Sequence, residues 1–492
     1  MRRLLLPLIK ILPLLKIASL LLAGFALAVV AFYSHVLGEV PDLKPWHRAS
    51  LEQEFSAARA SDVKTLPDYL ALEERVFAEL HGKVSAAIPA ADRLSLNRYF
   101  PGSAADPDAQ ATNWNRTFEL VPDQPSGGVL LLHGMSDSPY SLHAIASSLQ
   151  QHGWHVLALR LPGHGTAPAG LLDLHWQDLR AAVRVGMRHL RDRLGPVAPL
   201  MIVGYSNGAT LGAEYAVSML EGEQLPRLDG LVMISPSLAL SPIAGLAVWQ
   251  ARVSRLPGLE KLAWLDVLPE YDPYKYNSFP VHAGDEAYRL AGEVDTRLQR
   301  LMKGGVVRGF PRTLAFQSVI DATIKADGVA NVLMRRLAPG GHALVLYDIN
   351  RSADAVPFVR ERDTGWGRQL LEGESLPFSL TLITNENAAS SQVHAVTRPA
   401  GGAQTHPDPL NLSWPVGVFA LAHVSLPFPP DDPVYGALPA GERQIPLGRL
   451  EARGETGVLV VPASLITRLR YNPFYAYQAK RIVDFTETLK AQ

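Results

Sequence analysis

The amino-acid sequence predicts an α/β fold with a mostly parallel central sheet and helices on both of its faces. The main observation is an alternation, from about residue 118, of short apolar runs with longer amphipathic stretches. Two properties of the whole chain agree with it. Its 492 residues are enough for one large domain with insertions, and 47% apolar residues supply a sizeable core.

The expected elements follow one another in strand–helix order. Four apolar runs are typical of buried strands, at residues 128–132, 156–159, 199–203 and 231–235. Helical patterns separate them, at residues 138–149, 179–194 and 210–220. Ser138 and Pro139 suit the cap and first turn of the first of these helices. Because parallel sheets bind ligands beyond the carboxyl ends of their strands, functional residues are expected there.

Charge and cysteine content exclude several classes of function. Lys and Arg total 46 against 47 Asp and Glu, a net charge of −1, so no basic surface for nucleic acid is expected. The chain contains no cysteine, which excludes disulfides, Cys-ligated zinc, iron–sulfur clusters and thiol catalysis. It also lacks H-E-x-x-H, P-loop and G-x-G-x-x-G motifs. We therefore expect no catalytic metal and no cofactor.

The first 38 residues have the pattern of a membrane anchor. Four cations and no acid precede residues 17–38, which contain no charged side chain. At ~1.5 Å per residue these residues form a helix long enough to cross a bilayer core of ~30 Å. The positive-inside rule then predicts that the chain beyond about residue 38 lies on the exported side, periplasmic or extracellular. A cleaved signal peptide and a secreted protein are the alternative.

A G-x-S-x-G motif lies at residues 204–208, between an apolar run and a helical stretch. In this context the turn strains the backbone of the serine and projects its hydroxyl above the sheet. Glycines are required on both sides because side chains there would collide with the neighbouring strand and helix. Ser206 is therefore the predicted nucleophile, and an ordinary tight turn is the alternative.

Two further segments, 131–141 and 159–166, join this motif in resembling the α/β-hydrolase superfamily, in the style of carboxylesterases and monoacylglycerol lipases. The resemblance is clear over about residues 116–237 and weaker near residues 321 and 423. It implies an α/β-hydrolase fold with a helical cap.

The charge pattern of the N-terminal residues and the resemblance together divide the chain into three expected parts. These are a membrane anchor or signal peptide at residues 1–38, a helical spacer or packing arm at 39–115, and the hydrolase domain at 116–492. Within that domain we expect a cap insertion at about 242–301 and a second insertion at about 350–415.

The resemblance also implies an oxyanion hole made of backbone N–H groups. Asn207, directly after the nucleophile, and Met135, after a strand end, are the predicted donors. His133 and His164 precede Ser206, whereas the order in this fold is Ser, acid, His. Both histidines are therefore expected to brace turns.

The same chain order selects the acid and the base. Asp321 follows the strand-like run 313–318 and is the predicted acid, with Asp348 as the alternative. His423 ends the apolar run 416–422, interpreted as a strand, and is the predicted base. His394 is the main alternative, and His342 ranks below it.

We expect hydrolysis of carboxylic esters through an acyl-enzyme on Ser206. An acyl-lipid or medium-chain ester is the preferred substrate, because the expected cap is apolar and aromatic. An aminopeptidase-like amide hydrolase is one alternative, with Glu270 and Asp272 as the most suggestive ammonium-binding pair. A non-catalytic, membrane-tethered binding protein is the other.

Overall fold

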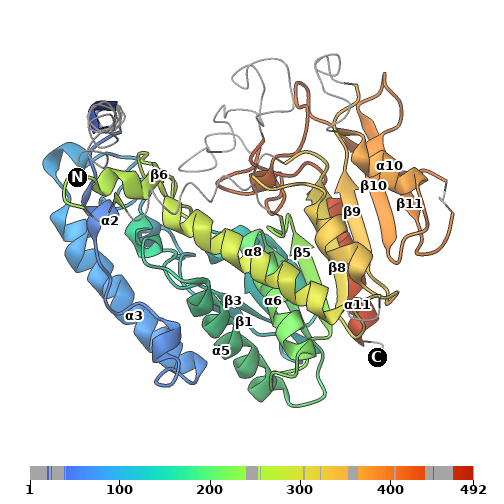
Figure 1. The fold of residues 1–492 in the computed structure, drawn as a ribbon, viewed down its shortest axis with the longest axis horizontal. Coiled ribbons are helices and arrows are strands. Elements are labelled where there is room, and N and C mark those ends of the chain that lie inside the picture. Colours follow the sequence, from blue (N-terminus) through green and yellow to red (C-terminus); the bar gives the residue numbers. More distant parts are fainter. Residues whose placement is uncertain are drawn as a thin grey trace, which may run out of the picture.

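Figure 1 shows the fold of the chain in a computed structural model. The structure describes residues 19–21, 24, 38, 40–239, 253–254, 256–302, 305–321, 323–352, 364–403, 406–437, 447 and 469–490. The predicted membrane segment, 17–38, lies almost entirely outside these residues, as does part of the predicted cap. Within the described residues, no helix has the length and apolar character needed to cross a bilayer. The membrane anchor and the signal peptide both stay predictions.

A ten-stranded sheet forms the centre of the molecule, in the order β1-β3-β2-β4-β5-β8-β9-β10-β11-β12. From β3 to β10 neighbouring strands are parallel, whereas β1, β11 and β12 pair antiparallel at the two edges. The predicted mostly parallel sheet is confirmed. The strands are β1 (Phe118–Leu120), β2 (Gly127–Leu132), β3 (Trp154–Leu159), β4 (Leu200–Tyr205), β5 (Gly230–Ile234), β8 (Arg312–Ser318), β9 (Ala343–Tyr347), β10 (Ser379–Asn385), β11 (Gln392–Arg398) and β12 (Asp408–Ser413).

Helices cover both faces of this sheet (Figure 1). Alternate residues of β2 point to opposite sides, so Leu130 and Leu132 join one apolar cluster and Val129 and Leu131 another. The first cluster includes α3 (Leu66–Lys83), α5 (Trp176–Leu194), α6 (Asn207–Leu220), α8 (Val281–Leu301) and α10 (Trp366–Glu372). The second includes α4 (His143–Gln151) and α11 (Tyr475–Lys490). The short helix α2 (Pro45–Arg48) precedes them all.

The predicted cap range contains an element of the main helical layer. Its last 21 residues form α8, whose apolar side packs against α6 and is buried in the cluster on that face of the sheet. Before α8, a short antiparallel pair is formed by β6 (Trp264–Asp266) and β7 (Phe279–Pro280). Residues 240–252, at the start of the predicted cap, lie outside the described residues.

Within the insertion predicted at about 350–415, strands β10 to β12 extend the central sheet. One expectation for the later part of the chain is wrong. The strand predicted at 416–422 is a turn, followed by a 3₁₀ helix at His423–Ser425. Pro415 cannot donate a ladder hydrogen bond, and Gly417 has a φ of 75°, so both residues oppose an extended strand there.

The arm at residues 39–115 is attached to the domain through a buried ion-pair network. Arg160, just after β3, is fully buried. Its Nε atom lies 3.0 Å from Glu73 Oε2 on α3, and its Nη2 atom lies 2.9 Å from Glu54 Oε1. The side chains of Glu54 and Glu73 are themselves 17% and 3% exposed. The cation therefore holds two acids of the arm against the sheet.

Replacing Arg160 with methionine is expected to lower the free energy of unfolding by about 3–5 kcal/mol, because two carboxylates lose their buried cation. Urea unfolding followed by circular dichroism measures the change. Lys480→Ala is the matched control, since that lysine pairs with Asp484 at a surface where the side chains are 72% and 51% exposed. Its effect should stay below about 1 kcal/mol. Equal losses in the two variants would contradict a structural role for the network.

Candidate active site

Ser206 lies at a sharp turn between the end of β4 and the start of α6. Its backbone has φ 53° and ψ −117°, a conformation rare for a residue with a side chain. A side chain at Gly208 would collide with the carbonyl of Leu132, and one at Gly204 with the backbone of Ala209. The two glycines of the motif thus allow β4, α6 and β2 to approach closely. The strained turn places the serine at the carboxyl end of the sheet, as expected.

His423 contacts Ser206 and Asp321 at the same time. Its Nε2 atom lies 2.9 Å from Ser206 Oγ, and its Nδ1 atom lies 2.7 Å from Asp321 Oδ2. The histidine side chain is 4% exposed and the aspartate side chain is fully buried. The structure thus brings together three side chains that are far apart in the sequence. In this geometry the imidazole can accept the serine proton while its other nitrogen donates to the carboxylate.

The carboxylate of Asp321 is held by three further donors. The backbone N–H groups of Thr323 and Ile324 donate to Oδ1 at 2.8 and 3.1 Å. The side-chain amide of Gln317, on β8, donates to Oδ2 at 3.1 Å. These bonds fix the direction from which the carboxylate meets His423, so the imidazole in turn is oriented toward Ser206.

The alternative acid and bases lie elsewhere. Asp348 is bound by the guanidinium groups of Arg351 and Arg368, at 2.8 and 3.2 Å. His394 lies on β11, opposite a residue of β10, near the far edge of the sheet. His342 directly precedes β9, and burial lowers its pKa to about 4. No described contact joins any of the three to Ser206.

The predicted oxyanion donors lie at the start of α6 and in the turn after β2. Asn207 is the first residue of α6, so its N–H has no acceptor within the helix. Met135 lies in the turn after β2, where Ser136 has a φ of 66° and its carbonyl accepts a hydrogen bond from the N–H of Tyr276. Within the described residues, neither predicted donor N–H makes a hydrogen bond. Both assignments stay predictions.

Gly134 explains how this turn approaches the serine. A side chain there would meet the carboxylate of Asp137 and the Cβ atom of Ser206. Asp137 is buried and its carboxylate lies 3.5 Å from the ammonium of Lys275. Burial raises the pKa of Asp137. The turn after β2 is thus held between the turn at Ser206 and residues 275–276.

His133 braces this turn and does not contact the serine. Its Nδ1–H donates to the carbonyl of Gly134 at 2.9 Å, and its Nε2 accepts from the N–H of Leu161 at 3.0 Å. Burial lowers the pKa of His133 well below its ordinary value, so the ring is neutral and has this donor–acceptor pair. His164 donates to the carbonyl of Pro162 at 2.8 Å, and burial lowers its pKa to about 4.

Ser237 is a contact of the nucleophile that the sequence analysis missed. Its Oγ atom lies 3.0 Å from Ser206 Oγ, and its N–H donates to the carbonyl of Ser206 at 3.3 Å. The residue follows β5, the parallel neighbour of β4. The carboxyl ends of adjacent parallel strands meet at one edge of the sheet. The position of Ser237 just after a predicted strand was therefore the signal that could have placed it near Ser206.

A small cavity of about 190 Å³ is lined in part by Val424, the residue after His423, and by none of the three site residues themselves. Its wall combines aromatic rings with two cations. The lining residues are Lys275, Tyr276, Asn277, Val424, Phe428, Tyr435 and Arg470. A second, more apolar cavity of about 680 Å³ is lined by parts of the arm, by residues 267–271 and by Leu447, and by none of the three site residues.

The parallel sheet, the strained serine at its carboxyl edge and the Ser–His–Asp contacts define a class of protein, the α/β-hydrolases. The chain has the α/β-hydrolase fold. Residues 123–269 match the model of the family described as serine aminopeptidase, S33. A thermostable monoacylglycerol lipase from Bacillus sp. (strain H-257) is 25% identical over 175 residues, which cover 36% of this chain and 66% of the lipase. The matched part is thus slightly less than two thirds of that relative.

Similar solved structures include lipases. One solved structure bears the description "LipS and LipT, two metagenome-derived lipolytic enzymes" and is 22% identical to this chain. The match covers 48% of this chain and 89% of the chain in that structure, with a TM-score of 0.39. The monoacylglycerol lipase of Paleococcus ferrophilus is 18% identical, with coverage of 47% and 87% and a TM-score of 0.35.

Proposed function

We propose that this protein hydrolyses carboxylic esters with Ser206 as the nucleophile. The observation that carries the proposal is the pair of contacts made by His423, at 2.9 Å to the serine and 2.7 Å to Asp321. A serine hydroxyl is a weak nucleophile unless an adjacent base removes its proton during attack. His423 is at hydrogen-bond distance for that transfer, and its proton then passes to the leaving alcohol.

The remaining steps follow from the same groups. Attack on the ester carbonyl forms a tetrahedral oxyanion, which the N–H groups of Met135 and Asn207 stabilise. Collapse of this intermediate releases the alcohol and leaves an acyl group on Ser206. Water, deprotonated by His423, then hydrolyses the acyl-enzyme. Asp321 holds the imidazole in the required tautomer and stabilises its protonated form.

An acyl-lipid or medium-chain ester is the proposed substrate class. The name of the curated relative, a monoacylglycerol lipase, supports it. The aromatic side chains of the cavity beside Val424, including Phe428 and Tyr435, supply an apolar wall for part of such a substrate.

The alternative is amide hydrolysis, which the description of the matching family favours. An aminopeptidase requires free acidic groups to hold a substrate ammonium. Asp272 instead accepts hydrogen bonds from the hydroxyl of Tyr435 and from two backbone N–H groups, and lies 3.6 Å from Arg470. Glu270 accepts from the N–H groups of Asn277 and Ser278. Both carboxylates are engaged in holding their own turn, and this supports the ester over the amide.

A substrate panel separates the two activities. We expect hydrolysis of p-nitrophenyl esters from acetate to palmitate, and of monoacylglycerols, with kcat/KM highest at medium or long acyl length. Aminoacyl p-nitroanilides should be hydrolysed at least a hundredfold more slowly, because Glu270 and Asp272 are not free to bind their ammonium group. Faster release from the anilides than from every ester would overturn the ester proposal and favour the aminopeptidase.

A further inference from the structure

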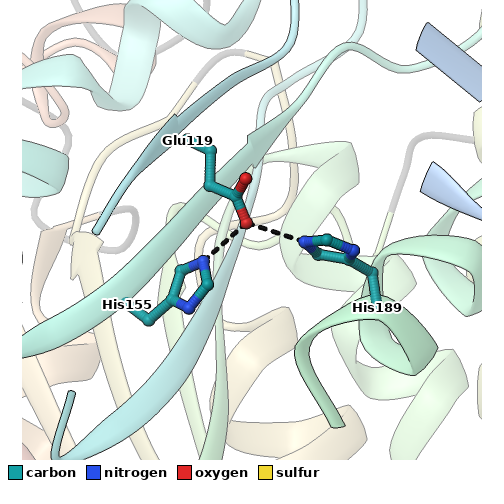
Figure 2. Close-up of side chains that lie close together, drawn as sticks. All are labelled: Glu119, His155 and His189. Carbon is teal, nitrogen blue, oxygen red and sulfur yellow. Dashed lines mark hydrogen bonds and ion pairs between the residues drawn. The ribbon is translucent and has the colours of Figure 1, made fainter. Parts of the chain in front are cut away.

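Two histidines and a glutamate converge on one point at an edge of the sheet, away from Ser206. They are Glu119 on β1, His155 on β3 and His189 on α5, and Figure 2 shows both rings pointing at the glutamate. The Nε2 atom of His155 lies 2.5 Å from Glu119 Oε1, and the Nε2 atom of His189 lies 2.7 Å from the same oxygen. One carboxylate oxygen is thus shared by two imidazoles.

Sheet geometry explains why these residues meet. Glu119 is the cross-strand partner of Leu157 in the antiparallel pair of β1 and β3. His155 is two residues before Leu157, so its side chain lies on the same face of the sheet. Helix α5 covers that face and approaches Leu157 at Gly186, three residues before His189. The cluster therefore joins an edge strand, the next strand and the covering helix.

We propose that Glu119, His155 and His189 form a binding site for a divalent transition metal of the Zn²⁺ type, with solvent completing the coordination. Two imidazole nitrogens and one carboxylate oxygen are a ligand set that zinc accepts. The three ligand atoms all lie within 4.8 Å of one another. A metal ion accepts the lone pairs of all three at once, and the carboxylate offsets half of its charge.

The geometry requires only a small opening of the cluster. With Zn–N and Zn–O distances of about 2.0–2.2 Å, neighbouring ligand atoms lie roughly 3–3.5 Å apart. The side chain of His155 is 2% exposed and fixed by the core, whereas those of His189 and Glu119 are 15% and 30% exposed. The two more exposed side chains can therefore move apart by less than about 1 Å to admit the ion.

The surroundings of Glu119 also favour a cation. Within the described part of the chain, its ion-pair partners are the two histidines, and no lysine or arginine pairs with it. Among the residues that the structure describes, a second group of similar composition is formed by His175, His282 and Glu286. There the guanidinium of Arg289 lies 3.5 Å from Glu286 Oε1, and His282 Nε2–H donates to the carbonyl of Leu174 at 2.8 Å. A competing cation and an occupied nitrogen disfavour metal binding at that second group.

The bound ion would have a structural role. β1 has three residues and forms one edge of the sheet, so few backbone hydrogen bonds hold it. A metal joined to β1, β3 and α5 would tie this edge strand to its neighbours. Binding to the folded chain alone raises stability in proportion to the logarithm of the free metal concentration. The inference is independent of the proposed ester hydrolysis.

The test uses the purified full chain, stripped with EDTA and dialysed, with Zn²⁺ and Co²⁺ as probes. We expect about one zinc per chain after equilibration at micromolar concentration, a higher Tm, and visible Co²⁺ absorption typical of low-coordinate nitrogen and oxygen ligands. His189→Ala and Glu119→Gln should each weaken zinc binding at least tenfold and remove the Tm shift. His189 and Glu119 are the more exposed ligands, so these variants are expected to fold, as circular dichroism will check.

His282→Ala, in the second group, is the matched control and should bind zinc as the wild type does. The proposal is overturned if the wild-type chain binds no zinc at micromolar concentration, since the cluster is then only a pair of hydrogen bonds to a carboxylate. It is equally overturned if His189→Ala binds zinc as tightly as the wild type, or if only His282→Ala loses it.

Discussion

Ser206→Ala is expected to lower kcat for p-nitrophenyl ester hydrolysis by a factor of about 10⁴ or more, because no acyl-enzyme can form without the hydroxyl. Binding of the ester should change little, since the removed atom acts in the transition state. Steady-state kinetics on the purified variant measure both quantities. Labelling by a fluorophosphonate should be lost at the same time, because that reagent attacks the activated serine.

Ser237→Ala is the matched control for the labelling. Its hydroxyl lies 3.0 Å from that of Ser206, so any reagent that reaches one serine reaches the other. We expect the Ser237→Ala variant to be labelled on Ser206, as peptide mapping will show. Labelling that persists in Ser206→Ala and disappears in Ser237→Ala would show that Ser237, and not Ser206, is the nucleophile.

His423→Ala should reduce kcat by a comparable factor with KM nearly unchanged, because the base acts only in the transition state. Asp321→Asn should cost about 10⁴-fold, since the imidazole remains but loses the partner that sets its tautomer. Rates measured against pH, with the thermal stability of each variant, separate loss of catalysis from loss of folding.

His394→Ala is the control for the base. Arg351→Ala, which removes one of the two guanidinium partners of Asp348, is the control for the acid. Both residues lie at the β9–β11 side of the sheet with no described contact to Ser206, so kcat should remain within a few-fold of the wild type. If the His394→Ala variant were nearly inactive and the His423→Ala variant active, the base would be His394 and not His423.

Local patterns were sufficient for the serine turn and for the central parallel strands of the sheet. A strand that is buried on both faces reads as a continuous apolar run, and β2, β4 and β5 were predicted within about two residues on that basis. The G-x-S-x-G motif also carries its own structural reason, because Gly204 and Gly208 are the positions where the chain cannot accept a side chain. Neither inference required knowledge of distant contacts.

Prediction of the acid and the base rested on chain order alone. Asp321 and His423 are 102 positions apart in the sequence, and the described part of the segment between them contains four strands of the sheet, β9 to β12. Residues 416–422 form a turn where a strand was expected. The apolar composition of this run favoured a strand, because a short apolar run has the same composition in a buried turn as in a strand. Pro415 and Gly417 were the signals against it. The contact of His423 with Ser206 depends on how that whole segment is folded.

The sequence by itself determined the alternation of strands and helices, the strained serine turn and the order in which acid and base follow it, since each depends on neighbours a few residues apart. Only the tertiary structure decided which acid meets which histidine, that Ser237 contacts the nucleophile, and that Glu119, His155 and His189 share one point. These contacts join segments up to 217 residues apart. Side-chain geometry at such separations is set by strand order, register and helix packing, and none of these is written in a local pattern.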